Sequence, residues 1–185
     1  MTTLACEEPT DSYLEEFFEV KDATVFERVN ALDAVLDEDV NLFQRDLNQY
    51  ARKVPGMSFC GSGIERVAFY DSETNLVYKR LYVKNEKQNR DERRSLYKLQ
   101  AYLDGSEIRY ADTWYVTTDL GNEYQVQEYI EGVGENDTSD FKSEWLDFLL
   151  EEHESVTGFR DDLFRGNFAC NVGKFAVVLI DMLSV

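Results

Sequence analysis

The apolar positions in the first third of the chain follow a helical period. Between residues 11 and 54 they recur at spacings of three and four, so that each segment carries a single apolar stripe. This spacing predicts amphipathic helices that pack against something else. The positions are Leu14, Phe17, Phe18, Val25, Phe26, Val29, Leu32, Leu36, Leu42, Phe43, Leu47 and Tyr50.

The pattern changes at Gly61, where β-branched and aromatic residues begin to dominate. Residues 66–70 and 76–83 read as two strands joined by the turn-prone segment 71–75. Two further strands are predicted at 113–118 and 124–130, separated by a second turn signal. The order of these elements predicts an antiparallel sheet built from hairpins.

A polar, basic helix is predicted between the two hairpins, at residues 88–103. Its inner stripe consists of Leu96, Leu99 and Leu103, and Asp104-Gly105 supplies a stop signal. After a polar stretch, a helix at 141–152 and an apolar strand at 175–180 are expected. These elements suggest three regions: a helical segment at 1–56, the sheet region at 57–132 and a small region at 133–185.

Composition limits the class of protein. The chain has 185 residues, of which 43% are hydrophobic, enough for one compact domain with at most two small lobes. The sequence has neither a long apolar run nor a leader-like start, which predicts a cytoplasmic protein without a membrane partner. Three scattered cysteines disfavour both a disulfide framework and a zinc site.

The formal net charge of −18 disfavours direct binding to nucleic acid. The charge is uneven, because Lys21 and Arg28 are the only basic residues within 1–42, whereas 79–98 is mainly basic. One interpretation is a pair of solvated acidic faces. The other is an acidic surface that imitates nucleic-acid phosphates or docks on a basic partner.

Two features of the first predicted hairpins could handle phosphate. In the turn Gly61-Ser62-Gly63 the glycines would let backbone N–H groups approach a polyphosphate, although two glycines can also mark an ordinary turn. Lys79 falls on the same strand face as Val77, where an anionic partner would offset the cost of burial. An edge lysine whose stem reaches out to water is the alternative.

Acidic and amide residues follow in a meaningful order. Glu92, on the predicted helix, could fold back to pair with Lys79, although Asp91 and Glu86 compete for this role. Further on, Asp162 and Asn167 share one short loop, and Asp181 follows the last strand. The oxygen atoms of Asn167 and Asp181 suit Mg²⁺, although Asp and Asn are also common turn residues.

Taken together, residues 59–182 resemble the protein-kinase-like superfamily, and most closely the small kinase-like proteins of tailed bacteriophages. The resemblance is carried by Gly61-Ser62-Gly63, by the strand beginning Arg66-Val67-Ala68 and by the strand lysine that follows. It implies a minimal α+β kinase-like fold. In that fold a five-stranded antiparallel sheet carries one packed helix, a helical extension precedes it and a truncated second lobe follows.

The resemblance also implies roles for individual residues. Lys79 would hold the α- and β-phosphates of ATP and Glu92 would orient it. Asp162 would accept the proton of the substrate hydroxyl. The remaining positions would bind the cofactors, ATP at Gly61, Ser62, Gly63, Glu128 and Ile130, and Mg²⁺ at Asn167 and Asp181.

Three positions depart from the kinase pattern. Arg66 stands where a third glycine would be, Phe164 replaces a basic or imidazole side chain, and Met182 replaces the glycine after the metal-binding Asp. Two functions therefore stay open. The first is a phage-type kinase that phosphorylates a host bacterial protein on Ser or Thr. The second is a weak or inactive kinase-fold protein whose acidic surface binds and inhibits a host nucleic-acid enzyme.

Overall fold

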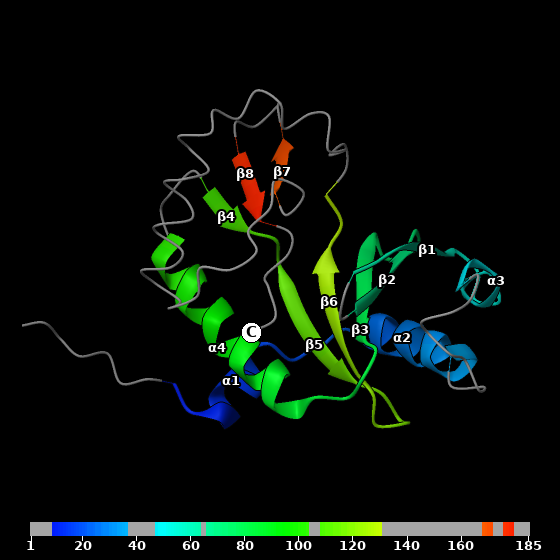
Figure 1. Cartoon of the computed structure of the whole chain (residues 1–185), viewed down its shortest axis with the longest axis horizontal. Coiled ribbons are helices and arrows are strands. Elements are labelled where there is room, and N and C mark those ends of the chain that lie inside the picture. The colour runs from blue at the N-terminus through cyan, green and yellow to red at the C-terminus, as the bar shows by residue number, and fades with distance from the viewer. Residues whose placement is uncertain are drawn as a thin grey trace, which may run out of the picture.

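The computed structural model describes residues 9–36, 47–63, 66–103, 108–130, 168–171 and 176–179 (Figure 1). Its first part is helical, as the apolar spacing predicted. The helices are α1 (Asp11–Phe17), α2 (Ala23–Leu36) and α3 (Leu47–Ala51). Thr10 caps the first of them by accepting a hydrogen bond from the backbone of Tyr13.

The predicted five-stranded antiparallel sheet is confirmed. Its strand order is β1-β2-β3-β6-β5, and every neighbouring pair is antiparallel. The strands are β1 (Met57–Ser62), β2 (Arg66–Asp71), β3 (Leu76–Leu81), β5 (Thr113–Thr117) and β6 (Glu123–Glu128).

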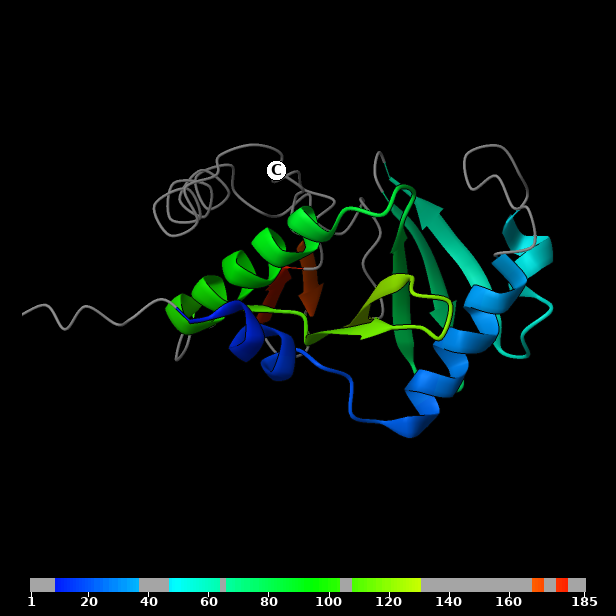
Figure 2. The same ribbon diagram turned by 90° about the horizontal axis from the view of Figure 1, so that it is seen from below.

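The two long helices cover opposite faces of this sheet (Figure 2). One face carries Arg80 and Tyr124, which both bond Asp33 of α2. The other carries Gln125, which bonds Glu92 of α4 (Glu86–Leu103). Because successive strand residues point to opposite faces, these contacts place α2 and α4 on different sides.

A second, three-stranded sheet has the order β4-β8-β7. It contains β4 (Ile108–Tyr110), β7 (Phe168–Asn171) and β8 (Ala176–Leu179). Strand β8 falls within the predicted strand 175–180, whereas β4 and β7 were not predicted. The parallel pairing of β4 with β8 joins segments far apart in the sequence, and a local pattern does not reveal such a contact.

The hydrophobic core is continuous from α2 and α3 into the five-stranded sheet. Val29 and Leu32 of α2 are fully buried and belong to the same cluster as Phe69, Tyr78 and Val126. Helices α2 and α3 therefore share one interior with the sheet. No helix in the described part of the chain is long and apolar enough to cross a membrane.

Two buried carboxylates also tie α2 to the sheet. Asp33 accepts hydrogen bonds from Arg80 at 3.0 Å and from Tyr124 at 2.8 Å. Asp71, on β2, accepts two from Arg28 of α2, at 2.6 and 2.8 Å. Both carboxylates are fully buried, so these bonds satisfy charges that would otherwise be costly.

Candidate functional site

One row of residues crosses the sheet through Lys79. The strand registers pair Gly61 with Ala68, Ala68 with Lys79, Lys79 with Gln125 and Gln125 with Tyr115. Residues paired across antiparallel strands share a face, and here it is the face covered by α4. The predicted lysine therefore lies in line with the first glycine of the predicted phosphate turn, two strands away.

The glycine turn leaves open space above its backbone. The N–H of Gly63 donates to the carbonyl of Arg66 at 2.8 Å, and Tyr82 donates to the carbonyl of Gly63 at 3.2 Å. A methyl group added at Gly61 would meet nothing within 4 Å, and at Gly63 it would meet only the carbonyl of Arg66 at 3.9 Å. A ligand can therefore approach this backbone closely.

Glu92 is buried beneath this row, with partners that the sequence did not indicate. Arg66 binds both oxygen atoms of the carboxylate, with 2.8 Å from Nη1 to Oε1. Gln125 also donates to Oε1, at 3.1 Å. The arginine that stands in place of a third glycine thus reaches from β2 to the carboxylate expected to orient Lys79.

Glu128 and Ile130, the residues expected to contact ATP beyond the glycine turn, lie where β6 ends. The N–H of Glu128 donates to the carbonyl of Asp112 at 2.9 Å, and its carboxylate accepts from the N–H of Asp112 at 3.2 Å. The backbone N–H of Tyr129 donates to the carbonyl of Asn75 at 3.4 Å. The next residue, Ile130, is half-buried. This segment is held against the start of β5, on the strand next to the one that carries Lys79.

Asp162, Asn167 and Asp181 lie outside the described residues, so their proposed roles stay predictions. Their neighbours in the sequence are described. Phe168, which directly follows Asn167, pairs with Leu179, two residues before Asp181. Leu179 also pairs with Tyr110, the last residue of β4. Two residues, Ala111 and Asp112, connect β4 to β5.

Arg66 and Gln125 are the site residues that sequence analysis missed. A signal for Arg66 was present, because it interrupts the glycine pattern at the start of a strand whose partner helix carries several acids. Gln125 gave none, since a glutamine within an alternating strand usually faces solvent. Of the acids that competed with Glu92, Glu86 is exposed and pairs with Lys84 at 3.5 Å.

Neither a protein-family model nor a curated protein matches the chain. Among solved structures, the fold is similar to that of APH(2")-IIia in a complex with GDP and kanamycin, at 14% sequence identity and a TM-score of 0.40. The match covers 69% of this chain and 66% of that chain, so this chain spans just under two thirds of that protein.

Proposed function

We propose that the chain binds a magnesium nucleotide, Mg-ATP, on the α4 face of its five-stranded sheet. The observation that carries this proposal is the row from Gly61 to Lys79 and Gln125, which joins an open glycine turn, a lysine and a helix with a buried glutamate. The ammonium group supplies the charge that a polyphosphate needs, and the glycine backbone leaves space beside it.

The residues divide the work of binding between them. Lys79 holds the α- and β-phosphates, the glycine turn covers them, and the segment from Glu128 to Ile130 meets adenine. Arg66 already binds both carboxylate oxygens of Glu92. Glu92 therefore supports Lys79 either by binding both cations at once or by exchanging Arg66 for Lys79 when the nucleotide binds. Magnesium, when bound, would neutralise phosphate charge.

The second sheet supports the predicted metal ligands. In the sequence, Asn167 directly precedes Phe168 and Asp181 comes two residues after Leu179, and Phe168 and Leu179 are paired across β7 and β8. The amide of Asn167 and the carboxylate of Asp181 would supply the oxygen ligands that Mg²⁺ prefers. Asp162 is then the residue to accept the substrate's hydroxyl proton, and a Ser or Thr of a host bacterial protein is the proposed substrate.

Thermal unfolding with Mg-ATP tests nucleotide binding directly. A ligand at one hundred times its Kd stabilises by about 2.7 kcal/mol, which for a domain of this size raises Tm by roughly 5–10 °C. Lys79→Ala should abolish that rise, whereas Lys87→Ala, which removes an exposed lysine of α4, should retain it. No rise for the wild-type chain would refute nucleotide binding.

A second candidate function rests on the surface of α1. Glu15 and Glu16 are exposed there beside Tyr13 and Phe17, which keep 47% and 48% of their surfaces accessible. Aromatic residues are enriched at protein interfaces, and the carboxylates beside them favour a basic partner. We propose that this surface binds a host protein with a basic surface, such as a nucleic-acid enzyme, and that nucleotide turnover is then dispensable.

A further inference from the structure

A cleft of about 580 Å³ opens between α1, α4 and the ends of β5 and β6. The segment after α1 forms one wall and runs beside β5. The backbone N–H of Tyr115 donates to the carbonyl of Phe18 at 2.7 Å, and the N–H of Val20 donates to the carbonyl of Tyr115 at 3.0 Å. The charged and polar lining includes Glu15, Glu16, Glu19, Arg93, Tyr115 and Glu123. We call it the acidic cleft.

The floor of the acidic cleft holds polar groups that the described part of the chain leaves unpartnered. Tyr115 is 4% exposed and Arg93 8% exposed, and the guanidinium lies 4.4 Å from the centroid of the tyrosine ring. Arg93 donates to Oε2 of Glu123 at 2.7 Å. Yet Nε of Arg93, Oη of Tyr115 and Oε1 of Glu123 have no hydrogen-bond partner among the described residues.

These three atoms have almost no accessible surface, so they lie beneath the cleft and not on its open wall. Burial holds the pKa of Tyr115 well above its usual value, so the phenol stays neutral. The groups that a ligand in the cleft meets are therefore the exposed carboxylates of Glu15, Glu16 and Glu19.

The charge of the lining selects a cation. Glu15, Glu16 and Glu19 are exposed carboxylates at the rim, and Arg93 already pairs with Glu123. Carboxylates around a partly enclosed cleft attract positive groups and repel phosphates. An anionic ligand is thus disfavoured, whereas a lysine or arginine side chain is favoured.

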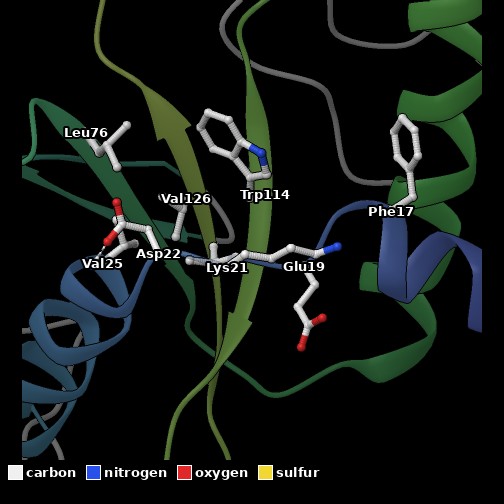
Figure 3. A pocket seen from close by; sticks show the side chains of 9 residues that line it. Phe17, Glu19, Lys21, Asp22, Val25, Leu76, Trp114 and Val126 are labelled. Carbon is white, nitrogen blue, oxygen red and sulfur yellow. Dashed lines mark hydrogen bonds between the residues drawn. The ribbon is translucent and has the colours of Figure 1, made fainter.

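A second, apolar cavity of about 440 Å³ adjoins the acidic cleft, and Glu19 and Val20 line both. Its apolar lining includes Phe17, Leu76, Trp114 and Val126. In Figure 3 Trp114 stands between Leu76 on one side and Phe17 on the other, with Lys21 and Asp22 along the rim. A free diamine would occupy only the first cavity, whereas a peptide can fill both.

We propose that the two cavities together bind a basic segment of a partner protein. A lysine or arginine side chain enters the acidic cleft and faces the carboxylates of Glu15, Glu16 and Glu19, and a neighbouring large apolar side chain packs on Trp114. This binding does not depend on nucleotide. It assigns the partner surface of the second candidate function to particular residues, and its failure would leave Mg-ATP binding untouched.

Fluorescence anisotropy with a labelled, end-blocked peptide of sequence Gly-Lys-Leu-Gly-Lys-Leu-Gly tests the proposal on the full chain. The triple variant Glu15→Gln, Glu16→Gln, Glu19→Gln should weaken binding at least tenfold, as should Thr117→Lys, which places a cation at the exposed edge of the cleft. Trp114→Ala should weaken the same peptide without affecting a variant peptide in which glycine replaces leucine.

The matched control is Glu27→Gln, Asp112→Asn, Asp119→Asn, which removes the same charge from exposed positions away from both cavities. It should change affinity less than twofold. Equal losses in the two triple variants would overturn the proposal in favour of a general charge effect. Complete competition by spermidine at the peptide's own concentration would overturn it in favour of a small-amine site. A peptide with acetylated lysines should not bind.

Discussion

At the scale of single residues, the contact between Arg66 and Glu92 is the main finding that the sequence did not reveal. Only 12% of the arginine side chain and 3% of the glutamate side chain are exposed, so neither charge is well hydrated. A buried pair of this kind is costly to break from one side, because the remaining charge keeps its burial but loses its partner. The pair therefore contributes to folding as well as to the site.

We expect Arg66→Ala to lower the free energy of unfolding by about 3 kcal/mol, because Glu92 is then left with Gln125. Adding Glu92→Gln should recover part of that loss by removing the stranded charge. Arg94→Ala is the control, since Arg94 is 44% exposed and its bond to Asp11 should contribute under about 1 kcal/mol. Urea unfolding of the wild-type chain and the three variants measures these changes, and equal losses for Arg66→Ala and Arg94→Ala would contradict the role of burial.

Asp71 makes stability depend on pH. Burial alone would raise its pKa, but hydrogen bonds from Arg28, the N–H of Glu73, Thr74 and Tyr78 outweigh burial, and the pKa is lowered. A folded-state pKa below the unfolded value of about 3.9 stabilises the protein above that pH. The stabilisation is lost as the pH falls through the folded-state pKa.

Asp71→Asn should therefore lower the free energy of unfolding by about 3 kcal/mol at pH 7. The difference from the wild-type chain should shrink below about pH 4, where the Asp71 carboxyl of the unfolded wild-type chain begins to take up a proton. Unfolding measured between pH 2 and pH 7 checks this. Asp11→Asn, at a partly exposed ion pair, should show a much smaller effect at every pH, and a gap that stayed constant with pH would contradict the mechanism.

At the scale of elements, the sequence predicted what local periodicity encodes. The helical stripe through Leu96 and the alternation in β2, β3, β5 and β6 identified elements close to their observed bounds. Helix α4 begins two residues earlier than predicted because Asn85 caps it, accepting from the N–H of Gln88 at 3.1 Å. Strands β4 and β7 were missed, since their short segments gain order from pairing with β8 and not from a pattern of their own.

The same distinction applies to the site. Alternation predicted that Lys79 shares a face of β3 with Val77, and the short stretch of chain between them suggested that Glu92 could fold back toward Lys79. Neither pattern could identify Arg66 as the partner, because that depends on how far a guanidinium on β2 reaches under α4. The row that joins Gly61, Lys79 and Gln125 depends on strand register, which long-range packing determines.

The glycine turn gives a prediction that separates ligand binding from folding. Gly61→Ala and Gly63→Ala should leave the free energy of unfolding within about 1 kcal/mol of the wild-type value, because the added methyl meets open space. They should still reduce the Tm rise produced by Mg-ATP, since the methyl occupies the approach to the phosphates.

Gly56→Ala is the opposing control for these variants. Gly56 has φ +77°, and an added methyl would lie 3.0 Å from Glu73, so this change should destabilise by about 1–2 kcal/mol. It should keep the nucleotide-dependent Tm rise. Large destabilisation by Gly61→Ala would show that the turn needs its glycine for folding, and the argument for phosphate binding there would fail.

At the scale of the whole molecule, α2 behaves as part of the sheet domain. Its buried side chains fill one face of the sheet, and Asp33 and Asp71 hold it there through bonds to Arg80 and Arg28. The opposite face is left to α4 and the proposed nucleotide. The face under α2 carries the apolar core, and the face under α4 carries polar residues. The proposed nucleotide site and the acidic cleft can therefore lie next to α4 without exposing the core.

A chain beginning at Met57 should therefore fail to unfold cooperatively. It would lose Val25, Val29, Leu32 and Leu36 from the core, and burial of each such side chain contributes about 1.5–3 kcal/mol. Their sum approaches the whole stability of a typical domain, about 5–15 kcal/mol. The variant Leu32→Ala provides a graded comparison and should cost about 2–5 kcal/mol while preserving a cooperative transition.

Calorimetry and urea unfolding of these two variants decide how α2 contributes. Adding a peptide of residues 1–56 to the shortened chain should restore a cooperative transition, because the missing layer then covers Phe69, Tyr78 and Val126 again. If the shortened chain unfolded cooperatively without the peptide, the sheet would have to be stable with one apolar face exposed. The first helices would then be an appendage, and the two buried carboxylates would serve only to attach it.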